Sequence, residues 1–458
     1  MISLLEVAER IHKGPKMEEK DWDLGIFKKM GELTKKYGIA YPKDGSYFNL
    51  DDEMAEAAFR AAVEFLVDRG VYCLSTRRVV KFDKKEVLEA IAEAPNAITV
   101  GEGMDARVIK QKRVEGEEML GQCPGHHAPF TEQMAPLVVK NFAQIASTDY
   151  LEGFNFTVVD GRDIFGIPLE AYAARREVAW LREGVRKAGR PGLAVAYYPI
   201  NTKASTLIAP MDPDYGLRRT DGVLLSILPD TKMEQDMLTA AIVYDEYGCF
   251  KVNGGANSPI GGFCGGAEGA AIEAIAKTIA GWIVYRDTIF NTGVWDINVT
   301  TKKKIDILPQ QKWGCSLVLQ GLNNHTNFIS NGVTHAQSGP GTETHLIEMG
   351  IIAVNDAING ANLYIVRQAR ARMDASQTPL EAEFMMEVAN ATVRARIGRK
   401  EGNRVLKKLI ETIQGRDVEP GCDHVNDCYD WVHHQPYKEY AEIYENVKQV
   451  FRNCGIPV

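Results

Sequence analysis

The spacing of hydrophobic residues changes near residue 95. Before that point, apolar residues recur at helical intervals, as in the segment 54–70, which begins after three acidic residues, Asp51, Asp52 and Glu53. Acidic residues are favoured at a helix start, and Gly70 marks the expected end of this helix. The segment 71–82 alternates apolar and polar residues and predicts a small pair of strands.

Beyond residue 95, short apolar runs alternate with amphipathic helical segments. Eight runs predict strands, and they cover residues 118–123, 153–159, 192–198, 222–228, 249–254, 288–299, 326–332 and 361–366. Eight strands that alternate with helices are the number found in a TIM (β/α)8 barrel. An open doubly wound sheet is the structural alternative, but no G-x-G-x-x-G motif follows the first strand.

Three segments are therefore predicted within an α/β fold. Residues 1–95 form an N-terminal helical extension packed on the barrel, residues 96–400 form the TIM barrel, and residues 401–458 form C-terminal helices that close the same domain. The last segment contains helical spacing at 402–415 and 437–453.

Composition narrows the functional class. The 458 residues include 53 basic and 61 acidic side chains, a net charge of −8, and the absence of a long basic run argues against nucleic acid as a partner. No apolar window approaches the length of a membrane helix, and the N-terminus lacks the pattern of a signal peptide. The eight cysteines are scattered without a C-x-x-C pair, which indicates reduced thiols. We expect a cytoplasmic enzyme without a membrane partner.

In a barrel of this kind, chemistry is expected where the strands end at their carboxyl side. Two candidates follow predicted strands. Asp160 could act as a general acid or base, or it could cap a helix, and His335 could be catalytic or structural. A zinc site drawn from His325, His335, His345, Cys264 or Asp160 lacks the close spacing of specific zinc motifs, so Zn²⁺ is left open without being predicted.

Two glycine-rich stretches follow predicted strands. Residues 253–269 could form the floor of a pocket or allow close packing of a helix on a strand. Residues 338–345 lead into a helix whose free N–H groups could hold an anion, although the Thr342 side chain could satisfy them instead. The residues by themselves thus indicate a barrel enzyme and leave its reaction open.

Seven stretches share their form and order with one known family. They are KDWDL (20–24), ELTKKYGI (32–39), GVYCLSTRRVVKF (70–82), AGRPGLAV (188–195), PIGGFCGGAE (259–268), SGPGTE (338–343) and YAEIYENVKQVFRNCGIPV (440–458). In these stretches, over nearly its whole length, the chain resembles the monomethylamine:corrinoid methyltransferases. The resemblance implies a TIM barrel in a homo-oligomer that passes a methyl group to the cobalt of a separate corrinoid (cobalamin) protein.

The chain also departs from the family pattern. The methylamine enzymes carry pyrrolysine at the place that matches Ala196. By the same match, two pocket glutamates of the family fall near Leu224 and Ala256, a glutamine at Val333, a tyrosine at His335 and an arginine at Asp160. These differences favour a member without pyrrolysine, similar to the O-demethylase methyltransferases that act on methoxylated aromatic compounds.

The preferred prediction is a methyltransferase that moves a methyl group from a methoxylated aromatic compound (O-demethylation) to Co(I) of a separate corrinoid protein. A proton donor would help the departing oxygen, and the candidates for it are His335, Tyr197 and Asp160. The residues predicted to bind substrate are Ala196, Tyr198, Asn201, Asn253, Ala256, Asn257, Phe263, Val333 and Gln337. The glycines predicted to face the corrinoid are Gly261, Gly262, Gly265, Gly266, Gly339 and Gly341.

Two alternatives remain. The methyl donor could be a quaternary, tertiary or primary methylated amine, since tyrosines such as Tyr197 and Tyr198 could form an aromatic cage around a cation. In the other alternative, the barrel is not catalytic and binds a methylated ligand or the corrinoid protein.

Overall fold

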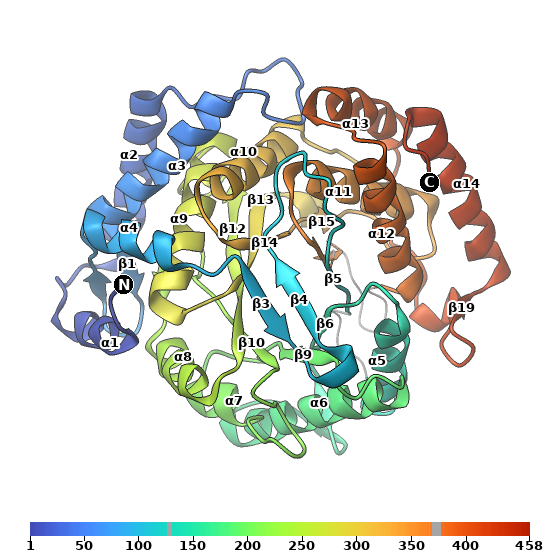
Figure 1. Ribbon diagram of the computed structural model, residues 1–458, viewed down its shortest axis with the longest axis horizontal. Coiled ribbons are helices and arrows are strands. Elements are labelled where there is room, and N and C mark those ends of the chain that lie inside the picture. Colours follow the sequence, from blue (N-terminus) through green and yellow to red (C-terminus); the bar gives the residue numbers. More distant parts are fainter. Residues whose placement is uncertain (126–130, 366, 369–376) are drawn as a thin grey trace.

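Helices surround a barrel of parallel strands in the computed structural model, which describes residues 1–125, 131–365, 367–368 and 377–458 (Figure 1). The barrel strands are β5 (Gln122–Cys123), β6 (Tyr150–Glu152), β9 (Ala194–Tyr197), β10 (Gly222–Leu225), β12 (Phe250–Ile260), β13 (Ile289–Asp296), β14 (Ile329–Gly332) and β16 (Leu363–Tyr364). Six of them form one continuous parallel sheet in the order β6-β9-β10-β12-β13-β14.

The remaining two strands close the barrel. β16 pairs in parallel with β5. Single bridges, Gln122 to Thr148 and Asn331 to Asn362, connect this pair to the two edges of the six-stranded sheet. The closed ring confirms the predicted TIM barrel.

Most barrel strands are followed by a helix that packs on the outside of the ring. These helices are α5 (Ala135–Gln144), α6 (Ile167–Lys187), α7 (Ala204–Ile208), α8 (Gln235–Tyr247), α9 (Ala267–Tyr285), α10 (Pro309–His325), α11 (Glu343–Asn359) and α12 (Pro379–Arg394). None of the helices in the described part of the chain is long and apolar enough to cross a membrane.

Further helices lie before and after the barrel. They are α1 (Leu4–Lys13), α2 (Glu19–Tyr37), α3 (Asp52–Arg69), α4 (Lys84–Glu93), α13 (Arg399–Ile413) and α14 (Lys438–Cys454), and the short 3₁₀ turns are η1 (Gly103–Asp105), η2 (Val299–Thr301) and η3 (Val425–Asp427). Helix α3 begins as predicted, because the Asp51 carboxylate accepts the N–H groups of Glu53 and Met54.

The short strands outside the barrel form small sheets. They are β1 (Val71–Cys73), β2 (Arg78–Val80), β3 (Ala97–Val100), β4 (Arg107–Lys110), β7 (Val158–Val159), β8 (Arg162–Asp163), β11 (Lys232–Met233), β15 (His335–Ala336), β17 (Arg367–Gln368), β18 (Tyr429–Asp430) and β19 (Gln435–Pro436). β1 and β2 are the strand pair expected in residues 71–82.

One barrel strand lies earlier than predicted. The sequence pattern places the second strand at 153–159, whereas β6 ends at Glu152. The apolar residues of the predicted run leave the sheet, and the rings of Phe154 and Phe156 pack edge to face at 5.2 Å in the layer outside the barrel. The apolar run therefore reflects core packing rather than strand pairing.

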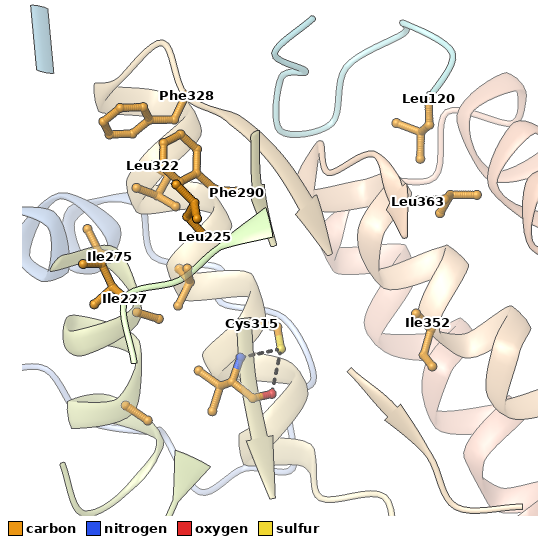
Figure 2. Close-up of a cluster of buried hydrophobic side chains, with 14 of the residues drawn as sticks. Leu120, Leu225, Ile227, Ile275, Phe290, Cys315, Leu322, Phe328, Ile352 and Leu363 are labelled. Carbon is orange, nitrogen blue, oxygen red and sulfur yellow. Dashed lines mark hydrogen bonds between the residues drawn. The ribbon is translucent and has the colours of Figure 1, made fainter. Parts of the chain in front are cut away.

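Two separate hydrophobic clusters follow from strand alternation. The outer cluster fills the layer between strands and helices, where Leu225 of β10 lies near Phe290, and Ile227 lies near Ile275 of α9 (Figure 2). It also includes Phe65 of α3 and Phe451 of α14, so both terminal segments pack on the barrel. The division of the chain at residues 95 and 400 stays a prediction.

The interior cluster lies inside the ring of strands, and a hairpin closes it at the amino ends of the strands. Val100 of β3 and Ile109 of β4 belong to this cluster. A hydrogen bond holds the hairpin turn against the start of β9. The Glu102 N–H donates to the Gly192 carbonyl at 2.8 Å. Figure 1 shows β3 and β4 crossing the centre of the ring. The hairpin thus covers the amino ends of the strands.

Candidate functional site

The interior of the barrel becomes polar toward the carboxyl ends of its strands. The interior cluster contains Val100, Ile109, Cys123, Tyr150, Ala194, Ala196, Leu224, Phe250, Val252, Ile289, Ile329, Val333, Tyr364 and Ile365. Polar side chains of the strands are buried beside these residues, which makes this end of the interior the candidate site.

A band of hydrogen bonds crosses the interior. The Asn331 side-chain amide donates to the Tyr150 hydroxyl at 3.0 Å and to the Asn291 side-chain oxygen at 2.9 Å. The Tyr364 hydroxyl donates to the Glu152 carboxylate. Burial raises the pKa of Tyr150 and of Cys123 well above their ordinary values, and the nearby Glu152 carboxylate adds to both shifts. The hydrogen bonds therefore join β6, β13, β14 and β16, with the buried Glu152 carboxylate among them and Cys123 of β5 nearby.

Three predicted substrate-binding residues face this interior. Ala196 and Val333 belong to the interior cluster, and the half-buried Tyr198 packs against it. Their positions follow from alternation along β9 and β14, since residues two apart lie on the same face of a strand.

Tyr197, which was predicted as a catalytic residue, faces the opposite way. It is fully buried in the outer cluster. Burial raises its pKa well above the ordinary value, and the Glu177 carboxylate of α6 adds to the shift. Its hydroxyl is thus separated from the barrel interior by the backbone of β9.

His335 and Gln337 line a small cavity at the ends of β13 and β14. The His335 ring is half-buried and lies 5.4 Å from the Trp295 ring, tilted by 41°. The Gln337 side chain forms two hydrogen bonds with the backbone of Asp306. Its amide oxygen accepts the Asp306 N–H at 3.1 Å, and its amide nitrogen donates to the Asp306 carbonyl at 3.3 Å. Gln337 therefore acts first as a link between two loops.

Buried charges border the same cavity. Burial raises the pKa of Glu348 to about 7, although its carboxylate accepts the N–H groups of Gln337 and Ser338 at 2.7 and 2.8 Å. Burial lowers the pKa of Lys312, which lines the cavity from α10. Lys302 bridges Asp296 and Asp306 at 2.5 and 3.0 Å. The negative charges of these carboxylates therefore lie close to the positive charges of the two lysines.

The predicted asparagines do not converge on the interior. The Asn253 amide donates to Asp287 at 2.9 Å in the outer layer, and the Asn201 amide donates to Glu170 of α6. Ala256 is buried and its carbonyl accepts the Thr292 hydroxyl at 3.0 Å, while Asn257 is half-buried and its carbonyl accepts the Lys277 ammonium.

Two more predicted residues lie on the surface. Asp160 is exposed in the β7–β8 turn, with φ of 49°, and accepts the Tyr172 hydroxyl at 2.6 Å. Phe263 is 40% exposed. Asp160 was predicted as a proton donor because the second strand was expected to end beside it, and the earlier end of β6 removes that placement.

The predicted corrinoid-facing glycines divide into two groups. Gly261, Gly262, Gly265 and Gly266 form a tight, partly exposed loop, and a groove runs between this loop and α2. Gly339 is buried so closely against the Pro420 carbonyl that a Cβ atom would lie 2.1 Å from it, and Gly341 packs near Cys428. The second pair therefore accommodates chain packing.

The proposed zinc ligands are spread apart. Within the residues that the structure describes, no group of three or more His, Cys, Asp and Glu side chains could hold a metal ion. His325 stacks on Phe59 at 4.9 Å, and the buried His345 bonds Gln368 at 3.2 Å.

The interior residues that sequence reasoning missed are Cys123, Tyr150, Glu152, Asn291, Asn331 and Tyr364. Glu152 was missed because the second strand was placed one residue too late to include it. The signal that could have found it is the short pattern Tyr-Leu-Glu followed by Gly153, in which Tyr150 and Glu152 share a face.

Comparisons with known proteins agree along the whole chain. A family model described as "Monomethylamine methyltransferase MtmB" matches residues 2–456. Monomethylamine methyltransferase MtmB2 of Methanosarcina acetivorans and MtmB of Methanosarcina mazei are each 27% identical to this chain over 454 residues, or 98% of it and 97% of the relative. The crystal structure of the Methanosarcina barkeri monomethylamine methyltransferase has a TM-score of 0.88 at 24% identity, covers 99% of this chain and 98% of its own, and shows the same fold.

Proposed function

The chain belongs to the monomethylamine methyltransferase MtmB family, and from that membership we propose that it transfers a methyl group from a methylated amine to a corrinoid carried by a separate protein. The prediction of a methoxylated aromatic donor is wrong. The family model over residues 2–456 and the curated relatives are monomethylamine methyltransferases, and this overturns the O-demethylase reading. The amine alternative replaces it.

One structural observation supports an amine best: the polar band inside the barrel surrounds a carboxylate. Glu152 is 2% exposed and is held by Tyr364. A buried carboxylate favours a positively charged ligand, and tyrosine rings beside it favour a cation further.

The proposed roles of the chain's residues follow from their positions. Ala196 and Val333 present small apolar side chains in the interior, and Tyr198 would cover the donor from the carboxyl end of β9. Such residues orient the methyl group and exclude water, and alignment of reactants can lower a barrier by about 7 kcal/mol in a favourable case. The role of His335 as a proton donor to a departing oxygen falls with the aromatic donor, and this residue, two positions beyond Val333, stays a proposed contact at the carboxyl ends of the strands.

The corrinoid would approach from the carboxyl ends of the strands. The hairpin β3–β4 closes the other end, while the half-buried Tyr198 and Asn257 lie at this one. The residues present therefore fit a partner that enters here, and the exposed Gly261 loop is a proposed part of its contact surface. When bound, the reduced corrinoid supplies the electron pair that takes up the methyl carbon. A homo-oligomeric assembly is proposed on the resemblance alone.

The function is tested by mixing the protein with a Co(I) corrinoid protein and a panel of monomethylamine, dimethylamine, trimethylamine, tetramethylammonium and a methoxybenzoate. We expect the absorption spectrum of methyl-Co(III) with at least one amine and not with the methoxybenzoate. A spectrum unchanged by every amine would overturn the proposed function.

A further inference from the structure

Glu152 occupies a distinctive place on the second barrel strand. Its neighbour Leu151 belongs to the outer cluster, so alternation directs Glu152 inward. In the parallel pairing of β6 with β9, Glu152 lies opposite Ala196. Among the described inward-facing positions of the eight strands, Glu152 is the one carboxylate.

The surroundings of Glu152 hold it in a fixed position. The Tyr364 hydroxyl donates to one carboxylate oxygen from the neighbouring side of the barrel. Cys123 and Tyr150 lie close enough for the carboxylate to raise both of their pKa values. Tyr150 is held in turn by Asn331, whose amide donates to it at 3.0 Å. A carboxylate fixed in this way is ready to meet a ligand without rearrangement.

Opposite the carboxylate, Ala196 presents only a methyl group. Ala196 is fully buried, and its carbonyl accepts the N–H of Gly153 at 2.7 Å, which fixes the distance between β6 and β9. Tyr198 lies on the same face of the chain two residues farther along. A carboxylate, a small residue and tyrosine rings form a combination that suits a small organic cation.

We propose that Glu152, positioned by Tyr364, binds the positively charged nitrogen of the methyl donor, so that the donor enters as an ammonium ion. This inference rests on the proposed function. In the transfer, the bond between methyl carbon and nitrogen breaks and its electron pair stays on nitrogen, which leaves as a neutral amine. The new bond to the methyl carbon uses the electron pair of the reduced corrinoid cobalt.

The charge on nitrogen falls as this transfer proceeds. Glu152 therefore stabilises the bound ammonium more than the transition state, and its loss should raise KM without lowering kcat. A group that protonates the leaving nitrogen would show the reverse pattern. The split between KM and kcat distinguishes a binding role for Glu152 from an acid–base role.

The chain offers a matched control on the other side of the same strand. Glu177 of α6 is also 2% exposed, and its carboxylate lies beside Gly153 in the outer layer, where a Cβ atom on that glycine would be 2.5 Å from it. Glu177→Gln removes a buried carboxylate without altering the barrel interior. Glu152→Gln removes one from the interior.

The experiment measures binding of monomethylammonium and tetramethylammonium to the full chain by calorimetry, without corrinoid. We expect Glu152→Gln to weaken binding at least tenfold, Tyr364→Phe about threefold, and Glu177→Gln less than twofold. Thermal melting identifies variants that fail to fold, and Tyr364→Phe keeps the test decisive if Glu152→Gln is one of them.

Equal binding by the wild-type chain, Glu152→Gln and Tyr364→Phe would overturn the inference, as would equal losses in all three variants or no binding by the wild-type chain. Failure here can be separated from failure of the proposed function. Amine turnover with unchanged binding by Glu152→Gln would remove only the role of Glu152. Ammonium binding that depends on Glu152, without methyl transfer from any amine, would remove only the methyltransferase proposal.

Discussion

Glu152 and Glu177 lie on opposite sides of strand β6, and their surroundings differ sharply. Glu152 belongs to a polar band that joins four strands toward their carboxyl ends. Glu177 lies in the apolar layer beneath α6, where burial raises its pKa well above the ordinary value. We therefore expect two equally buried carboxylates to have different roles. The inner one serves a ligand, while the outer one lowers the stability of the folded chain at neutral pH.

The two tyrosines that end β9 show the same division. Tyr198 packs on the interior cluster, whereas Tyr197 is buried in the outer cluster. Neighbours in sequence thus face the barrel interior and the outer layer respectively. Changes in the outer layer should affect the free energy of unfolding, and changes in the interior should affect the donor.

The largest expected effect is in the outer layer, at Phe290. Its ring is 1% exposed and packs edge to face on Phe328 at 4.8 Å (Figure 2). Phe290→Ala should lower the free energy of unfolding by about 3–5 kcal/mol, because it leaves a cavity that the layer cannot fill. Urea denaturation measures the change. Val158→Ala, at a side chain that is 43% exposed, is the control and should cost less than about 0.5 kcal/mol.

The second prediction concerns pH and the outer face of β14. Burial raises the pKa of Asp356 of α11 to about 8, against the partial compensation of Lys312 on α10. Between about pH 4 and pH 8, the unfolded chain has released this proton and the folded chain keeps it, so stability falls as the pH rises. The Asp356→Asn variant should lack the decrease in stability that Asp356 causes as the pH rises.

We expect the variant to gain on the order of 2 kcal/mol relative to the wild-type chain between pH 5 and pH 8. Asparagine keeps the shape needed beside Gly332, where a Cβ atom would lie 2.2 Å from the carboxylate. Urea denaturation at both pH values provides the measurement, and parallel stability curves for the two proteins would contradict the assignment of a raised pKa.

Much of the fold could be predicted from the sequence, because the spacing of apolar residues along the chain matches the helices and strands that form. The barrel, the strand pair in residues 71–82 and the helix capped by Asp51 follow from local patterns. The β3–β4 hairpin was not predicted, since it is stabilised by long-range contacts such as that between Glu102 and Gly192. The three-residue strand β6 is too short to show its period.

The site was harder to predict because it depends on which face each residue takes. Placing the second strand at 153–159 directed attention to Asp160 and away from Glu152. On β9, the two neighbouring tyrosines could not both face the interior, and the choice between them needed the register with β6 and β10. The amides of Asn201 and Asn253 were taken as free to bind a ligand, although Glu170 and Asp287 engage them.

The third prediction tests the inner side of β9. Tyr198→Ala removes a ring that packs on the interior cluster, while its half-buried position limits the damage to the core. We expect KM for the amine donor to rise about tenfold through the loss of aromatic contact, with a small change in the melting temperature. Steady-state kinetics with the corrinoid protein provides the measurement. An unchanged KM would place the donor away from Tyr198.

The smallest expected effect comes from Tyr197→Phe, which tests the outer side of the same strand. The Tyr197 ring is fully buried, and phenylalanine keeps its packing while removing only the hydroxyl near Glu177. The free energy of unfolding should change by no more than about 1 kcal/mol, because the hydroxyl contributes at most one modest hydrogen bond. Methyl transfer should stay within twofold of the wild-type rate, since the backbone of β9 separates this hydroxyl from the interior. Tyr198→Phe serves as the matched control on the inner face. A tenfold loss of kcat in Tyr197→Phe, with normal melting, would show that the hydroxyl reaches the reacting groups and that the two faces of β9 are not separated in function.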